Sequence, residues 1–179
     1  PPPQILVDAG RLAAVLIVSR QDKVRGDGLA PLPIVSDVVL HARTPVLLVP
    51  PGLASFQPEG IAAVAWNGST EAAYSLRRNL AFLRRASAVH ILTVDDDSED
   101  FPASEAVLYL ARHGIEAAAT AVASEGRGVA KALVESAQAL GASCLVAGAY
   151  GHSRLRETVL GGVTRDLLTE TTLPLLLSH

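Results

Sequence analysis

The sequence lacks the features that mark several common classes of protein. Of its 179 residues one is cysteine, none is methionine, 4% are aromatic and 18% are charged, with a formal net charge of −3. A single cysteine, Cys144, cannot form an internal disulfide or supply a cysteine cluster for a metal. The small net charge excludes nucleic-acid binding through bulk positive charge. No apolar run approaches the ~18 residues of a membrane span, and no signal segment is recognisable. We therefore expect a cytoplasmic protein with no nucleic-acid and no membrane partner.

Short apolar runs are abundant instead, and hydrophobic residues make up 49% of the chain, which excludes a disordered protein. From residue 61 onward these runs alternate with helical patterns. We expect strands at 61–66, 89–94, 115–122, 143–147 and 175–177, and helices beginning near residues 70, 102, 129 and 162. The first helix, capped by Ser69 or Thr70, has Glu71 in its first turn, where the helix dipole favours an anion, and carries Ala72, Leu76, Leu80 and Leu83 on one face. Strict alternation with near-continuous apolar strands favours an α/β fold of three layers, with a Rossmann-like parallel sheet covered by helices on both faces.

The beginning of the chain resembles its end. A shift of 129 residues places 13–50 on 142–179 without a gap, so that expected strands meet strands and expected helices meet helices. Under the same shift, Pro45 before one apolar strand coincides with Pro174 before the other. Self-similarity of this kind indicates an internal repeat.

The repeat suggests how the chain is divided. We interpret residues 1–50 as the C-terminal part of a degenerate first repeat, 51–60 as a linker and 61–179 as a complete domain. The first copy lacks the upstream part of the second, and the sequence has no initiator methionine. We therefore expect the native polypeptide to have a longer N-terminus.

Four glycines follow the expected strand at 143–147 and precede the last expected helix. Gly148 and Gly151 have two residues between them, and Gly161 and Gly162 follow after nine more. Glycine lets backbone N–H groups approach a phosphate closely, and a helix N-terminus presents unpaired N–H donors. In open parallel sheets, ligands bind beyond the carboxyl ends of the strands, where the strand order reverses. The pattern predicts an anion site, although each glycine could also serve only a turn or helix packing.

This spacing resembles the ATP-binding signature of the universal stress protein family, G-x2-G-x9-G followed by Ser or Thr. The stretch Asn67-Gly68-Ser69 after the first complete-domain strand and Pro174 before the last strand are also similar to that family. The resemblance implies an open parallel five-stranded sheet of order 3-2-1-4-5. It also implies a stress-response or regulatory protein that binds ATP or another adenine nucleotide, with or without Mg²⁺.

The resemblance further implies which residues would form the site. The contacts to base and ribose fall on Ala65, Asn67 and Val94. The contacts to phosphate fall on the glycine loop and the helix start, which comprise Gly148, Gly151, His152, Ser153, Gly161, Gly162, Val163 and Thr164.

Several positions depart from the family pattern. Gly162 stands where ATP-binding members have Ser or Thr, and this removes one hydroxyl that Thr164 would partly replace. Asn67 stands where the family usually has Asp, so an amide that both donates and accepts takes the place of a carboxylate. In the first repeat, the equivalents of the four glycines are Ser19, Asp22, Leu32 and Pro33.

Three functions stay open on the sequence alone. The first is a regulatory protein that binds an adenine nucleotide, and the second is a scaffold of the same family that takes no nucleotide. The third is a slow ATP hydrolase, for which no general base can be named because no catalytic motif is present.

Pairing through 175–177 is expected, either between two chains as a homodimer or between the two repeats. The acidic run 95–100 lacks the spaced ligands of a calcium loop, so we expect no metal site. Trp66 either packs in the core or flanks the base.

Overall fold

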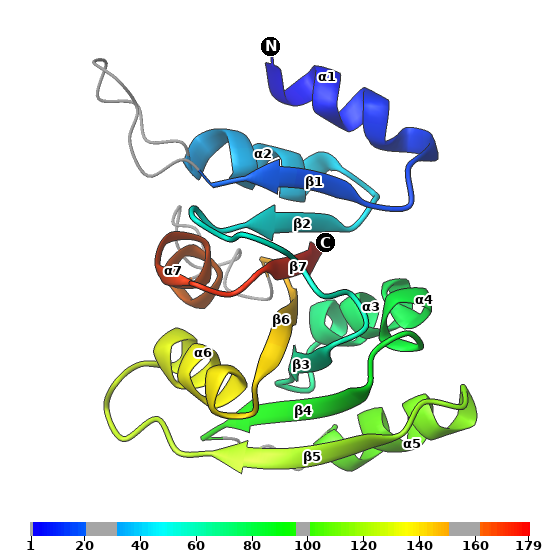
Figure 1. Ribbon diagram of the computed structural model, residues 1–179, viewed down its shortest axis with the longest axis vertical. Helices are drawn as coiled ribbons and strands as arrows, with labels where there is room; N and C mark the ends of the chain where they lie inside the picture. The colour runs from blue at the N-terminus through cyan, green and yellow to red at the C-terminus, as the bar shows by residue number, and fades with distance from the viewer. Residues whose placement is uncertain (1, 21–31, 96–100, 151–161) are drawn as a thin grey trace.

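The computed structural model describes residues 2–20, 32–95, 101–150 and 162–179. The expected site residues Gly151, His152, Ser153 and Gly161 lie outside these described residues. The described chain forms one sheet with helices on both of its faces (Figure 1). Its strands are β1 (Leu16–Ser19), β2 (Val46–Val49), β3 (Ile61–Ala65), β4 (Ala88–Val94), β5 (Ala117–Val122), β6 (Ala142–Gly148) and β7 (Leu175–Ser178). Its helices are α1 (Pro2–Ala9), the 3-10 turn η1 (Gly10–Leu12), α2 (Leu32–His41), α3 (Thr70–Arg78), α4 (Leu80–Leu83), α5 (Ala103–Arg112), α6 (Val129–Ala139) and α7 (Gly162–Glu170).

The sheet has seven strands in the order β1-β2-β7-β6-β3-β4-β5. Residues 61–179 contribute β3 to β7, and numbering these five strands along the chain gives the expected order 3-2-1-4-5. Two expectations need correction, because the sheet has seven strands rather than five and is not parallel throughout. The strands β2 and β7 pair antiparallel, while the other neighbouring strands pair parallel. The physical reason is that β2 adds to the edge of β7, whose backbone groups would otherwise lack partners.

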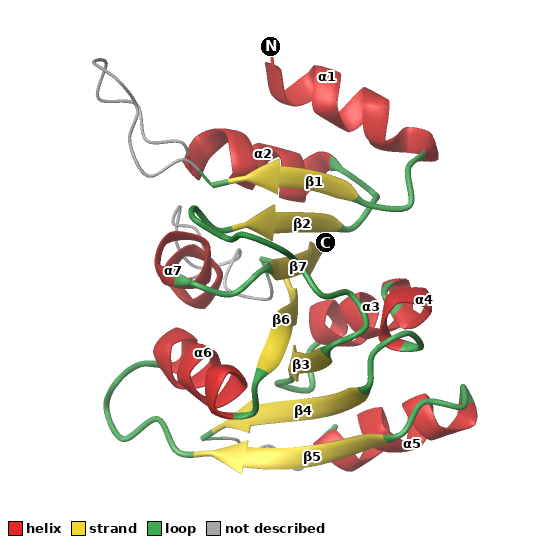
Figure 2. Cartoon of the chain, in the orientation of Figure 1, coloured by secondary structure: helices red, strands yellow, loops and turns green. Residues whose placement is uncertain are grey.

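Helices cover both faces of the sheet, as the apolar strands predicted (Figure 2). Successive residues of a strand face opposite sides, and β6 shows this clearly. Leu145 belongs to the core beneath α2, α6 and α7, whereas Val146 belongs to the core beneath α3, α4 and α5. Cys144 is on the same side as Val146 and is fully buried. Burial raises the pKa of the Cys144 thiol to about 12.

The segments β1-α2-β2 and β6-α7-β7 have the same strand register. In the first, Leu16 is paired with Val46, and in the second Leu145 is paired with Leu175, which is the same pairing after the shift of 129 residues. The strands β2 and β7 meet with Leu47 opposite Leu176, two residues that the shift also makes equivalent. The two segments therefore face each other across an approximate two-fold axis, and β7 has a strand on each side.

The helix after β3 begins as expected but ends earlier. Ser69 caps α3, and its hydroxyl accepts a hydrogen bond from the backbone N–H of Ala72 at 3.2 Å. The expected continuous helix is interrupted at Asn79, which separates α3 from α4. Asn79 is buried, and its Nδ2 donates to the Ser75 carbonyl at 2.8 Å and to the Ser178 hydroxyl at 3.0 Å. The interruption therefore ties the α3–α4 joint to the last strand. Helix α1, which the sequence pattern did not predict, contacts α2.

Candidate functional site

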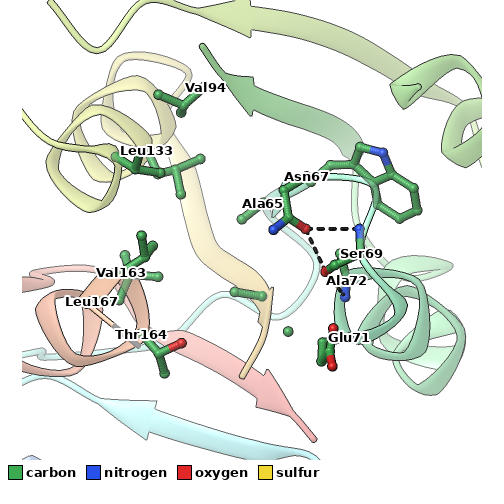
Figure 3. A pocket seen from close by; sticks show the side chains of 15 residues that line it. Ala65, Asn67, Ser69, Glu71, Ala72, Val94, Leu133, Val163, Thr164 and Leu167 are labelled. Atoms are coloured by element: carbon green, nitrogen blue, oxygen red, sulfur yellow. Dashed lines mark hydrogen bonds between the residues drawn. The ribbon is translucent and has the colours of Figure 1, made fainter. Parts of the chain in front are cut away.

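A cavity of about 430 Å³ opens at the carboxyl ends of β3, β4 and β6 (Figure 3). The N-termini of α3, α6 and α7 also reach it. Fifteen residues line the cavity: Ala65, Trp66, Asn67, Ser69, Glu71, Ala72, Val94, Val129, Leu133, Ala147, Gly148, Gly162, Val163, Thr164 and Leu167. The chain leaves β3 toward β4 on one side, and β6 flanks β3 on the other. The cavity therefore lies where the strand order reverses, which is the usual ligand position in open α/β sheets.

Every expected site residue that the structure describes lines this cavity. Ala65 and Asn67 come from the end of β3 and the turn after it, and Val94 ends β4. Gly148 ends β6, and α7 supplies its first three residues, 162–164. The fold thus brings together four segments that are far apart in the sequence.

The two polar atoms of the Asn67 amide have different surroundings. Its Oδ1 accepts hydrogen bonds from the Ser69 backbone N–H at 3.2 Å and from the Ser69 hydroxyl at 2.7 Å. Figure 3 shows its Nδ2 directed away from Ser69, on the side of the cavity. The oxygen therefore supports the cap of α3, while the NH₂ group can donate to a ligand acceptor. A carboxylate at this position would offer no such donor.

Gly148 is required by the packing of β6 against α3. A Cβ built on it would lie 2.5 Å from the carbonyl carbon of Glu71 and 2.8 Å from the backbone nitrogen of Ala72. Real Cβ atoms do not approach a backbone so closely, so no other residue fits without movement of α3. Helix packing alone is therefore sufficient to explain a glycine at position 148.

Gly162 differs from Gly148, because a Cβ at this position meets no atom of the described residues within 4 Å, its own helix backbone and chain neighbours aside. It opens α7, whose first turn has no acidic residue. The helix dipole and the N–H donors that a helix start presents make this end of the cavity favourable for an anion. The Thr164 side chain is 8% exposed, and its hydroxyl accepts a hydrogen bond from the Tyr150 backbone N–H at 3.4 Å. Part of the hydrogen-bonding capacity of Thr164 is therefore used within the protein.

Sequence reasoning missed part of the cavity wall. Val129 and Leu133 of α6 and Leu167 of α7 form an apolar side, and Ser69 and Glu71 come from the start of α3. Glu71 is the one charged residue on the wall as far as the structure describes it. Its position after β3 was visible in the sequence, where it was assigned only to the helix dipole. The apolar wall could not be distinguished from ordinary core.

Trp66 lies between this cavity and a second one of about 470 Å³ on the side of α3 and α5. It is 3% exposed, and its Nε1 donates to the Phe101 carbonyl at 3.2 Å. Its ring centroid lies 5.9 Å from that of Phe101. Of the two alternatives, core packing is therefore what the contacts of Trp66 show.

Within the described ranges, no group of three or more His, Cys, Asp or Glu residues could hold a metal ion. No helix among the same residues is long and apolar enough to cross a membrane.

The fold is that of the universal stress proteins. One from Archaeoglobus fulgidus superposes with a TM-score of 0.73 at 14% identity and covers 99% of this chain, which spans 64% of that protein. A Burkholderia pseudomallei protein of the family gives 0.52 at 23% identity, over 69% of this chain and 98% of its own. A universal stress protein in complex with cAMP gives 0.50 at 17% identity, over 69% of this chain and 99% of its own. No protein-family model and no curated protein sequence matches the chain. The resemblance predicted from the glycine spacing is thus confirmed for the fold.

Proposed function

We propose that this chain is a regulatory protein of the universal stress protein family and that its cavity binds an adenine nucleotide. One observation carries the proposal. The seven described residues that the family resemblance assigned to nucleotide contacts, from four separate segments, all line a single cavity. Such convergence is not expected if the resemblance were limited to glycine spacing. The cavity volume of about 430 Å³ falls within the ~300–1,000 Å³ of small-molecule sites.

The shape of the cavity supports an orientation for the nucleotide. The phosphates would lie at the N-terminus of α7, because a helix start offers N–H donors and no acidic side chain stands in the first turn of α7. The base and ribose would lie toward Ala65, Asn67 and Val94, near the apolar wall formed by α6. The cAMP complex of a structurally similar universal stress protein agrees with an adenine nucleotide as the ligand class. ATP, accompanied by Mg²⁺ or not, is the first ligand to test.

The N-terminal segment has a separate role in this proposal. We infer that residues 1–50 are the end of a first repeat, that 51–60 are a linker and that 61–179 are the nucleotide-binding domain, in a cytoplasmic protein. The identical registers of the two β-α-β segments and the antiparallel pairing of β2 with β7 support this division. The first unit would serve as the partner surface for the last strand.

A scaffold that takes no nucleotide is the second candidate. The close packing of Gly148 against Glu71 favours it, because that glycine has a purely structural reason to be present. Among the described residues, nothing packs against the Cβ position of Gly162, so packing gives no such reason for that glycine.

Titration calorimetry with ATP distinguishes the two candidates. Wild-type protein should bind ATP with a micromolar dissociation constant, and Ala65→Leu, which places a larger side chain at the cavity wall, should bind at least tenfold more weakly. The matched control is Ala118→Leu, on the exposed part of edge strand β5, which should bind like the wild type. Absence of heat up to millimolar ATP, or equal binding by all three proteins, would favour the scaffold.

A further inference from the structure

The cavity wall has one charged side chain among the described residues, and it is negative. Glu71 stands in the first turn of α3, and the other fourteen residues of the wall are apolar or uncharged polar. An adenine nucleotide is an anion, so this carboxylate repels the phosphates that the cavity would have to bind. Its presence therefore bears on which nucleotides the cavity accepts.

The charge of Glu71 is not neutralised by a neighbour in the described part of the chain. Its Oε2 is buried and has no hydrogen-bond partner there. The ion pairs that the structure shows involve other carboxylates. A carboxylate without a cationic partner, beside a cavity with apolar walls, acts on a bound ligand with less screening than it would in water.

The positive side of the cavity lies elsewhere. Figure 3 shows Val163 and Thr164 of α7 on one side of the cavity and Glu71 on the other. The first turn of α7 has no acidic residue, so the helix dipole and the N–H donors of a helix start favour an anion there. The starts of α3, α6 and α7 that reach the cavity thus attract an anion, and the Glu71 carboxylate is the charged group of the described wall that repels it.

We propose that Glu71 sets the charge that a ligand of this cavity can carry. Each negative charge added to the ligand is disfavoured by this carboxylate, so the site favours adenine ligands of low charge over free ATP. This inference rests on the proposed function, since it concerns the same cavity. It adds a specificity residue, whose effect depends on the charge of the ligand and not on the adenine ring.

The test compares a series of ligands that share one base and differ in charge. Adenosine, AMP, ADP and ATP are titrated in the presence of a metal chelator into wild-type protein and into Glu71→Gln. The glutamine keeps the size of the side chain and removes its charge. The ratio of the two dissociation constants should be close to one for adenosine. It should grow by about threefold or more for each added negative charge, as Coulomb repulsion within reach of the carboxylate requires.

Glu105→Gln is the matched control. Glu105 is the acidic residue in the first turn of α5, as Glu71 is in the first turn of α3, and it does not line this cavity. The control therefore removes the same net charge and the same helix-dipole contact, and its ratio should stay near one for every ligand. Glu71→Ala, which removes the charge without introducing an amide, gives a second test that does not depend on the folding of the glutamine variant.

The outcomes separate the two claims. A ratio that is the same for all four ligands would overturn the role of Glu71 while leaving nucleotide binding intact. An equal trend in Glu105→Gln would also overturn it, because net charge alone would then be the cause. Absence of binding by all ligands, adenosine included, in the wild type and in both Glu71 variants would contradict the proposed function itself, and the inference with it.

Discussion

At the scale of single residues, two glycines of one motif are present for different physical reasons. Gly148 lies against the backbone of α3, whereas Gly162 opens α7 and its Cβ position meets no other part of the described chain. The sequence presents both as members of one spacing pattern. Only the fold separates the glycine that packing demands from the glycine that a ligand or a different side chain could use.

Gly148→Ala should therefore destabilise the protein while Gly162→Ala should not. A methyl group at position 148 would overlap the backbone of Glu71 and Ala72, and overpacking of this kind costs about 1–3 kcal/mol. Urea denaturation of both variants measures the difference. Equal stability of the two variants would show that Gly148 is not held against α3.

Gly162→Ser should strengthen ATP binding modestly. The serine hydroxyl would stand at the N-terminus of α7 without a clash, and one added hydrogen bond of about 0.5–1.5 kcal/mol changes affinity by roughly tenfold or less. Calorimetry on the wild type and the variant gives the ratio. A variant that binds ATP when the wild type shows no binding at millimolar concentration would mean that the natural protein has lost the site.

Cys144 should lower the stability of the protein at alkaline pH. Its thiol pKa is about 12 in the folded state against an ordinary value of 9.0, so the unfolded chain loses the proton first as the pH rises. The folded state then loses about 1.4 kcal/mol for each pH unit above 9.0 and up to the raised pKa. Urea denaturation of the wild type and of Cys144→Ala at pH 8 and 10.5 measures this contribution, which the variant should lack. An identical pH dependence in both proteins would contradict it.

At the scale of elements, the joint between α3 and α4 is fixed by a contact across the chain. The amide of Asn79 donates to the Ser178 hydroxyl in β7, 99 residues away. The apolar spacing predicted one continuous helix through Leu83, because Leu76, Leu80 and Leu83 share one face. A sequence window does not contain Ser178, so the interruption could not be predicted from it.

Asn79→Ala should destabilise the protein by about 1–3 kcal/mol, because it leaves buried acceptors at Ser75 and Ser178 without their donor. Gln138→Ala is the control. It removes an exposed side-chain hydrogen bond, from Gln138 Nε2 to the Thr172 hydroxyl at 2.6 Å, and should change stability by less than about 0.5 kcal/mol. Thermal or urea denaturation gives both values, and similar losses would argue against a structural role for the Asn79 amide.

Most other elements could be predicted because their signals are local. The apolar strands, the Ser69 cap and the glycines after α5 and α6 are visible within a few residues, and Gly114 and Gly141 do adopt positive φ values of 72° and 69°. Helix α1 could not be predicted in this way. Its exposed Ile5 and Leu6 give a weak pattern, and its packing depends on α2, far along the chain.

At the scale of the whole molecule, the expected order of the strands β3 to β7 is correct, whereas the expected number of strands in the sheet is too small. Right-handed crossovers and strict alternation determine how β3 to β7 are arranged. The addition of β1 and β2 depends instead on which edge of the sheet is open to them. Leu47 opposite Leu176 shows that the edge used is that of β7, a choice that no local pattern encodes.

The candidate site follows from the same long-range arrangement. The positions of Ala65, Asn67, Val94 and Gly148 around one cavity could be anticipated from the family resemblance and the rule for strand ends. The charge of the wall could not, because it depends on Glu71 lining the cavity without a cationic neighbour among the described residues.

The central claim is that the cavity holds an adenine nucleotide, and the most direct measurement is to look for one in freshly purified protein. The protein is denatured and removed, and the released small molecules are identified by chromatography and mass spectrometry. We predict an adenine nucleotide released from the wild type and greatly reduced in Ala65→Leu. Absence of any nucleotide, together with absence of binding heat up to millimolar ATP and adenosine, would contradict the claim and leave the fold as a scaffold.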